Sequence, residues 1–116
     1  MPEEDCLFCR IVGRFVPAQI IAENDRFLAF NDINPQAPTH VLIVPKRHVA
    51  TIAELTSETA PLMGEAVVLA NGIARQTGIA EQGYRLVLNC GSGAGQSVFH
   101  VHLHLLGGRP MRWPPG

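Results

Sequence analysis

The chain has 116 residues, of which 47% are hydrophobic and 16% charged. This length predicts one domain, because domains cluster near ~100–150 residues, and the composition excludes intrinsic disorder. Nine basic against ten acidic residues give a net charge of −1, which argues against a nucleic-acid partner. No apolar run reaches the ~20 residues that a membrane span requires. We therefore expect neither nucleic acid nor a membrane as a partner.

The N-terminal segment, Met1–Cys6, is acidic and lacks the basic and apolar regions of a signal peptide. A cytoplasmic location is therefore expected. Two of the three cysteines, Cys6 and Cys9, have the spacing C-x-x-C. In a reducing compartment this spacing favours metal or thiol chemistry over a disulfide framework.

The first half of the chain predicts short elements with short connections. Pro17 ends any continuation of the first helix, Asn24-Asp25 is a turn pair, and Pro45 closes the last of these strands. The expected elements are a helix over 6–14, strands over 19–23 and 26–31, a rigid proline-containing loop over 34–38 and a buried strand over 40–44.

The main helix is expected over Thr59–Thr77, where apolar residues recur at a period of 3.6. Gly64 and Gly72 make this helix slim at a cost of about 1 kcal/mol each relative to Ala, which indicates close approach of the sheet or of a second subunit. Strands should follow over 84–89 and 98–106, and the tail from Arg109 to Gly116 should be irregular. The pattern predicts an α+β fold with a mainly antiparallel sheet.

Three alternating histidines, His100, His102 and His104, lie in the last predicted strand. Alternate side chains of a strand share a face, so these imidazoles should form a row with steps of roughly 6.6 Å. The apolar residues between them would face the core. Such a row suits either a zinc site or nucleophilic and acid–base chemistry near pH 7.

A glycine-rich loop, 91–97, lies directly before these histidines. Its backbone N–H groups and two hydroxyls suit a phosphate. It is not a Walker loop, since no Gly-Lys-Ser/Thr follows and no helix begins there. Together, the loop and the histidines favour phosphate chemistry over zinc-dependent hydrolysis.

The sequence QSVFHVHLHLL over 96–106 resembles the histidine-triad motif. The likeness extends over nearly the whole chain. The segments 30–40 (FNDINPQAPTH), 44–48 (VPKRH) and 113–116 (WPPG) are similar to the Hint branch, the histidine triad nucleotide-binding proteins. The resemblance implies a single HIT domain over 1–116, with about five antiparallel strands, one main helix and a short N-terminal helix.

The activity that this resemblance implies is that of a purine nucleoside phosphoramidase, which hydrolyses adenosine or guanosine 5′-monophosphoramidates. His102 would attack the α-phosphorus and form a nucleotidyl-histidine, which water would then hydrolyse. His104 and His40 would relay protons to the leaving amine. No organic cofactor is expected. The implied substrate contacts are Asn89, Gly95, Gln96 and Ser97 for the phosphate, Asp32 for the ribose, and Phe8, Ile11, Phe30 and Ile33 for the purine.

Two other functions stay open beside this one. The first is hydrolysis of dinucleoside polyphosphates, as in the Fhit branch, against which the Trp-Pro-Pro-Gly ending argues. The second is a nucleotide-binding or interaction module whose catalysis is incidental. For Asp32, a carboxylate suits a vicinal diol better than a phosphate, although a turn cap before Pro35 is the simpler alternative.

Cys6 and Cys9 provide half of a tetrahedral zinc site, and His48 and His100 are the candidates for the other half. Some bacterial relatives in the superfamily resemble this pattern and hold a structural zinc with it. That assignment leaves the other histidines free for catalysis and gives the metal no direct chemical role. The alternatives are two buried cysteines without metal, or a zinc on the histidine triad itself.

The tail contains Trp113, the one tryptophan of the chain. Because Trp is costly to leave in water, the tail should be held against protein. The resemblance implies a homodimer that joins through helix and sheet, with each tail reaching toward the partner's site. A tail folded back on its own subunit is the alternative.

Overall fold

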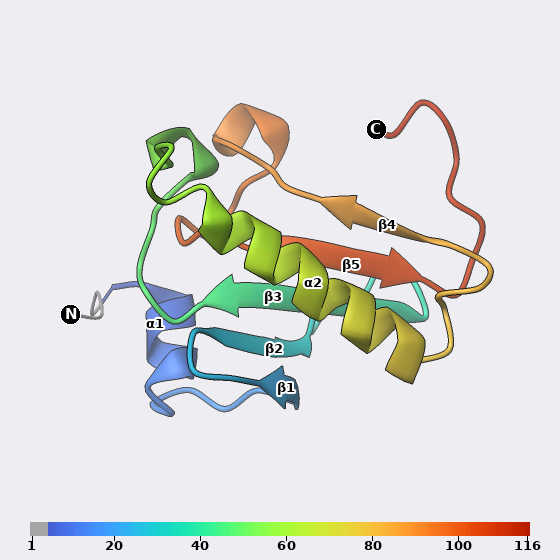
Figure 1. The fold of residues 1–116 in the computed structure, drawn as a ribbon, viewed down its shortest axis with the longest axis horizontal. Helices are drawn as coiled ribbons and strands as arrows, with labels where there is room; N and C mark the ends of the chain where they lie inside the picture. The colour runs from blue at the N-terminus through green and yellow to red at the C-terminus, as the bar shows by residue number, and fades with distance from the viewer. Residues whose placement is uncertain (1–4) are drawn as a thin grey trace.

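The computed structural model describes residues 5–116. Residues 1–4 lie outside the described residues. They include most of the acidic segment used for the expectation about a signal peptide, and the start of the predicted domain 1–116. Two short 3-10 turns, Ile52–Glu54 and Ser92–Ala94, complete the regular structure. The helices and strands, shown in Figure 1, are α1 (Leu7–Val12), β1 (Ile20–Glu23), β2 (Phe27–Asn31), β3 (Thr39–Pro45), α2 (Pro61–Gln76), β4 (Tyr84–Val87) and β5 (Leu103–Gly107).

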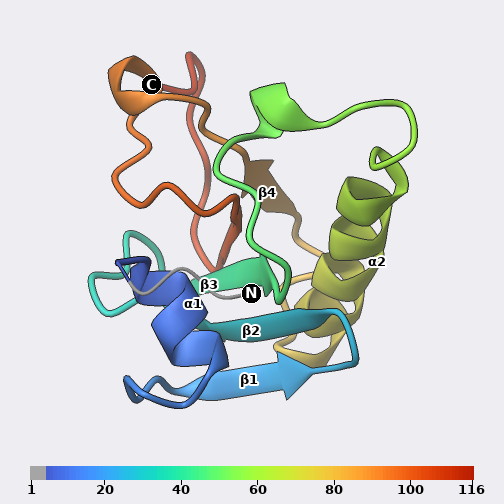
Figure 2. The same ribbon diagram turned by 90° about the vertical axis from the view of Figure 1, so that its left-hand side faces the viewer.

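The five strands form one antiparallel sheet in the order β1-β2-β3-β5-β4. Helix α2 covers one face and α1 lies against the other (Figure 2). Alternation along β2 supplies both layers, since Phe27 and Ala29 pack under α2 while Leu28 and Phe30 pack under α1. The predicted α+β fold with one main helix and a short N-terminal helix is confirmed.

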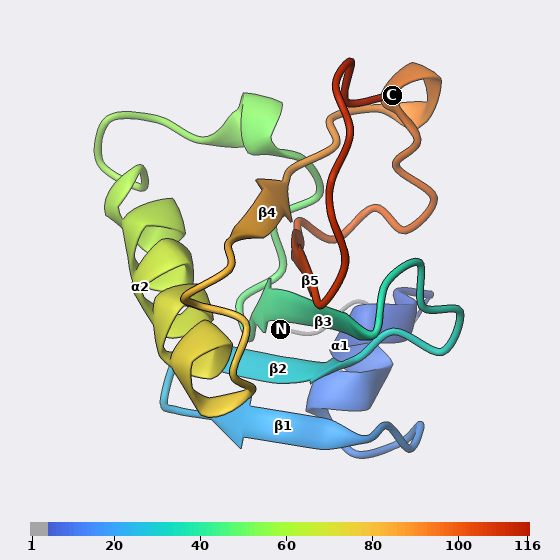
Figure 3. The same cartoon turned by 90° about the vertical axis from the view of Figure 1, so that its right-hand side faces the viewer.

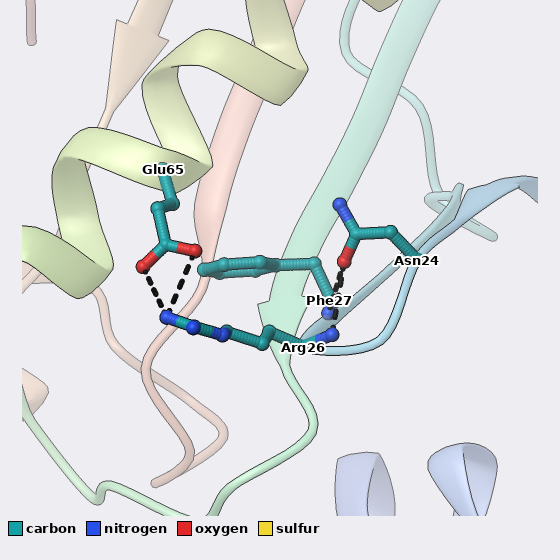
Figure 4. A network of polar contacts seen from close by, with 4 residues as sticks. All are labelled: Asn24, Arg26, Phe27 and Glu65. Carbon is teal, nitrogen blue, oxygen red and sulfur yellow. Dashed lines mark hydrogen bonds and ion pairs between the residues drawn. The ribbon is translucent and has the colours of Figure 1, made fainter.

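The β1–β2 hairpin forms at the predicted Asn24-Asp25 turn. The Asn24 side-chain oxygen accepts the N–H groups of Arg26 at 3.0 Å and Phe27 at 2.8 Å (Figure 4). Asn is favoured in turns because its short side chain makes such local bonds. The Arg26 guanidinium then reaches Glu65 of α2 at 2.9 Å, which ties the hairpin to the main helix.

The apolar stripe of α2 is buried at Ala66, Ala70, Ile73 and Ala74. An ideal Cβ placed on Gly64 or Gly72 meets no atom within 4 Å. The expectation that these glycines allow close approach of the sheet is therefore wrong, because they lie on the outer side of the helix. The neighbouring Val67 and Val68 are 36% and 68% exposed, so an apolar face of α2 is left uncovered within this chain.

The last strand begins at Leu103, and the expectation of a strand from Val98 is wrong over its first five residues. Continued register would pair Pro45 with Val101, but Pro45 has no N–H to donate. Its carbonyl instead accepts His100 Nε2–H at 2.7 Å, and the Val101 N–H bonds to Val49 at 2.7 Å. His100 and His102 therefore lie before β5, whereas the buried residues 101, 103 and 105 face the core as expected.

The tail from Arg109 onward is irregular, as predicted, and passes beside the open edge of β4 (Figure 3). Arg85 of β4 donates to the Arg112 carbonyl at 2.8 Å and holds it there. The Trp113 side chain is nevertheless 81% exposed. Among residues 5–116, no helix has the length and apolar character to cross a membrane.

Candidate functional site

A cavity of about 310 Å³ opens on the α1 side of the sheet. Its size falls at the lower end of the range typical of small-molecule sites. Most of its wall is apolar, and α1 and the loop over 16–18 contribute the largest part of it. Three of its polar residues lie together, since the ring centroids of His102 and His104 are 4.9 Å apart and the ligand atoms of Asp32 and His104 lie within 4.8 Å of one another. Predicted site residues that line the cavity are Phe8, Ile11, Phe30, Asp32, Ile33, Ser97, His102 and His104.

His102 lies on the cavity wall and is 8% exposed. Its Nδ1–H donates to the His100 carbonyl at 2.8 Å, so in the neutral ring Nε2 carries the lone pair. The Phe8 ring packs edge-on at a centroid distance of 5.0 Å and fixes the imidazole plane. Burial lowers the pKa of His102, which keeps that lone pair unprotonated at neutral pH and available as a nucleophile.

His40 and His104 form a hydrogen-bonded pair beside it, called here the His40–His104 pair. The Gln36 backbone N–H donates to His40 Nδ1 at 3.0 Å, so the proton of the neutral His40 ring is on Nε2. That Nε2–H faces His104 Nδ1 at 2.9 Å. His104 is thereby held with its own proton on Nε2. The hydrogen bonds therefore run in one direction, from the Gln36 N–H to His40 and from His40 to His104.

Burial lowers the pKa of His104 to about 4 and also lowers the pKa of His40. Asp32 opposes both shifts, since its Oδ2 lies 3.4 Å from His40 Nε2 and its charge favours an imidazolium. The pair is therefore neutral at pH 7 with a carboxylate at its edge. Such a pair can pass a proton without holding a fixed charge.

Asp32, His40 and His104 also lie close enough together to bind a cation. Metal binding at His40 Nε2 would need the ring proton on Nδ1, where the Gln36 N–H already points. Two N–H groups would then face each other in a buried position, which is costly. At Asp32, His40 and His104 the hydrogen-bond order therefore suits a proton relay better than a metal.

A second cluster suits a metal better. Its four ligand atoms lie within 4.8 Å of one another and come from Cys6, Cys9, His48 and His100. The Nδ1 atoms of His48 and His100 lie 3.2 Å apart. Both sulfurs lie 3.4 Å from His100 Nδ1, and the Cys9 sulfur lies 3.2 Å from His48 Nδ1. Tetrahedral zinc separates its N and S ligands by about 3.3–3.6 Å. Because His100 Nε2–H donates to the Pro45 carbonyl, its Nδ1 lone pair is left for a metal. The residues present fit zinc.

The residues predicted to bind phosphate in and near the glycine-rich loop differ in whether they reach the cavity. The Gln96 side chain is 2% exposed and bonds to the backbone of Gly91, Ala50 and Val98 at 2.8–3.1 Å. The N–H groups of Gly95 and Gln96 are also bonded within the loop. Ser97 reaches the cavity. The Asn89 amide lies close to Gly95, 3.9 Å from where a Cβ would be.

A family model described as the HIT domain matches residues 14–111. The chain belongs to the HIT domain family. It is 44% identical over 108 residues to the purine nucleoside phosphoramidase of Escherichia coli, covering 93% of this chain and 91% of that protein. An uncharacterised HIT-like protein of Synechocystis sp. is 49% identical over 113 residues, covering 97% and 98% of the two chains.

Solved structures of HIT proteins superpose closely on this one. A HIT family hydrolase from Legionella pneumophila has a TM-score of 0.94 at 51% identity, covering 97% of this chain and all of that one. A histidine triad protein from Clostridium difficile also gives 0.94, at 39% identity and 97% coverage of both chains. The five-stranded HIT fold is thus shown by sequence and by structure.

Two features of this HIT site were missed by the sequence reasoning. The Gln36 N–H fixes the His40 tautomer, and the Pro45 carbonyl fixes that of His100. Both are backbone groups, which carry no residue-specific signal. The sequence signal available for these two groups was the prolines, which predict a rigid loop around Gln36 and the end of a strand at Pro45.

Proposed function

We propose that this HIT protein is a purine nucleoside phosphoramidase that hydrolyses the P–N bond of adenosine or guanosine 5′-monophosphoramidates. The observation that carries the proposal is the free Nε2 of His102 on the wall of an apolar cavity, beside the ordered His40–His104 pair. The likeness to the Escherichia coli phosphoramidase supports the same conclusion.

Catalysis would proceed in two balanced halves. His102 Nε2 attacks the α-phosphorus while the P–N bond breaks, and His104 Nε2–H passes its proton to the amine nitrogen. The pair is replenished from water at its Asp32 edge. Water then attacks the phosphorus of the nucleotidyl-histidine and the bond to His102 Nε2 breaks. The proton lost by the water returns to solvent by the same route, and the nucleoside monophosphate leaves.

The cavity divides between the parts of this substrate. Phe8, Ile11 and Phe30 would hold the purine between apolar surfaces, with Ile33, 98% exposed, at the rim. Ser97 and Asn89 would contact the phosphate. Gly95 and Gln96 would contribute by shaping the loop, because their polar groups are bonded within the protein.

Zinc bound by Cys6, Cys9, His48 and His100 would have a structural role. A four-ligand site leaves no open position for substrate or water. Its effect on the reaction would pass through His100, whose carbonyl orients His102. No organic cofactor is required.

We also propose a homodimer. Within the described chain, the α2 face with Gly64, Val67, Val68 and Gly72 is uncovered, and β4 has one edge without a neighbouring strand. A twofold contact between two such faces would cover both at once. The exposed Trp113 would then be positioned to contact the partner.

Comparison of two substrates tests the reaction class. The metal-replete protein should hydrolyse an adenosine 5′-monophosphoramidate with a kcat/KM at least about a hundredfold above that for a diadenosine polyphosphate, since the relay delivers a proton to an amine. Preference for the polyphosphate would indicate the Fhit-like activity. If the protein hydrolysed neither substrate, the result would indicate a nucleotide-binding or interaction module. The His102→Ala protein provides the control for contaminating hydrolases.

Asp32→Asn should weaken binding of adenosine monophosphate by about tenfold to a hundredfold, since a hydrogen bond to a charged group contributes roughly 1.5–3 kcal/mol. Binding of the 2′-deoxynucleotide should fall less, because it already lacks one of the two hydroxyls. Titration calorimetry of both nucleotides measures this difference. Asp25→Asn, at the exposed hairpin turn, is the matched control. Equal losses for both sugars would remove Asp32 from the ribose site.

A further inference from the structure

The loop that carries the Gln36 N–H is held by a side chain from the far end of the sequence. Within the loop, the Gln36 side chain donates to the Asn34 carbonyl and the Asn34 N–H to Asp32, both across two residues. The longer connection comes from Arg109, whose Nε–H donates to the Gln36 carbonyl at 3.0 Å. Arg109 thus fixes the residue whose N–H orients His40.

The chain after β5 is built to bring Arg109 to this loop. Gly107 pairs with Thr39 at the end of the sheet, and Gly108 then turns the chain with a φ of +90°. A Cβ on Gly108 would lie 2.9 Å from the Pro38 side chain, so this corner packs directly on the loop. The Arg109 guanidinium is also oriented by its bond to the Pro110 carbonyl at 3.0 Å.

We propose that Arg109 is a positioning residue that fixes the backbone of Gln36 by its carbonyl, and through the N–H on the other side of the same Cα the tautomer of His40 and the donor orientation of His104. The connection runs from the Arg109 guanidinium to the Gln36 carbonyl, from the Gln36 N–H to His40 Nδ1, and from His40 Nε2–H to His104 Nδ1. This inference rests on the proposed phosphoramidase function, because it concerns the proton given to the leaving amine.

The role predicts a dependence on the leaving group. An alkylamine must be protonated as the P–N bond breaks, whereas p-nitrophenolate leaves as an anion. Misplacement of the His40–His104 pair should therefore slow the amine substrate and spare the ester. A purely structural defect would slow both, since both need His102 and the same cavity.

The experiment compares kcat for an alkyl phosphoramidate and for the p-nitrophenyl ester of adenosine monophosphate. Arg109→Ala should lower kcat for the amide about tenfold or more, since small displacements of catalytic groups have effects of this order. Its KM should stay within about twofold, and kcat for the ester should change little. Arg109→Lys, which keeps a donor, should recover part of the loss.

Arg85→Ala is the matched control, because Arg85 also holds the tail through a backbone carbonyl but does not contact the 34–38 loop. It should leave the ratio of the two kcat values unchanged. An Arg109→Ala ratio equal to the wild-type ratio would overturn the proposal. If Arg109→Ala does not fold, the same ratio measured on Arg109→Met, which keeps an extended side chain without a donor, decides in its place.

Nitrogen NMR of labelled histidine separates this inference from the proposed function. In the wild type, His40 should show an unprotonated Nδ1 and a protonated Nε2, and in Arg109→Ala the two signals should move toward each other. Unchanged His40 signals would overturn the role of Arg109 whatever the activity. A wild type that hydrolyses neither substrate would overturn the phosphoramidase assignment and leave this measurement to judge Arg109.

Discussion

His102→Ala is expected to fold normally and to lose phosphoramidase turnover by more than about a hundredfold in kcat, the lower limit for removal of even a general acid or base. The loss should be larger than this limit because His102 supplies the covalent route. Neither His40 nor His104 offers a substitute, since both ring nitrogens of His40 are hydrogen-bonded and His104 Nε2 carries the proton and so has no lone pair to attack with. Rapid quench followed by mass spectrometry should trap the nucleotide on His102 in the wild type.

A second variant distinguishes lost chemistry from lost structure. His102→Gly leaves a space beside Phe8, and added imidazole should enter it and restore part of the turnover by attacking the phosphorus itself. Thermal melting checks that the variants are folded. A His102→Ala protein that keeps more than about a hundredth of the wild-type kcat would contradict the assignment of the nucleophile.

Cys9→Ser is expected to lose about one zinc per chain and to lower Tm by at least about 10 °C. The binding free energy of a structural zinc is folding free energy, and each kcal/mol shifts Tm by roughly 4–8 °C in a domain near this size. The effect should be large because the site joins α1 to the segment before β5. Native mass spectrometry measures the zinc content and the mass of the assembly together.

Cys90→Ser is the matched control, because Cys90 is exposed and lies outside the four-residue cluster. It should keep the zinc and the wild-type Tm. Retention of zinc by Cys9→Ser would place the metal elsewhere. A carefully prepared wild type without any metal would return Cys6 and Cys9 to the role of core side chains. Turnover by Cys9→Ser should fall through displacement of His100 and its carbonyl.

The parts of the fold that follow from local patterns were predicted well. The periodicity of α2, the Asn24 turn and the buried strand expected over 40–44 each depend on residues near in sequence. The start of β5 was wrong because it depends on Pro45, more than fifty residues earlier, which ends the ladder and takes up His100. Sequence patterns within one strand carry no information about its partner.

The candidate site was predictable in its residues and not in its geometry. The resemblance named His40, His102 and His104, and the structure makes the three imidazoles neighbours. Their tautomers depend on the carbonyl of His100 and the N–H of Gln36, which every residue type could supply. The side chain of Gln96 matched a phosphate ligand by sequence, yet it bonds to three backbone groups.

His100 makes one contact with its side chain and another with its backbone. Its imidazole closes the cysteine-containing cluster, while its carbonyl holds Nδ1–H of His102. If the cluster holds an ion, whatever tightens one of these contacts must tighten the other, because both depend on the placement of one residue. Thermodynamic reciprocity then requires that a nucleotide which favours the ordered His102 also raises the affinity for the ion, and that the ion raises the affinity for the nucleotide by the same factor.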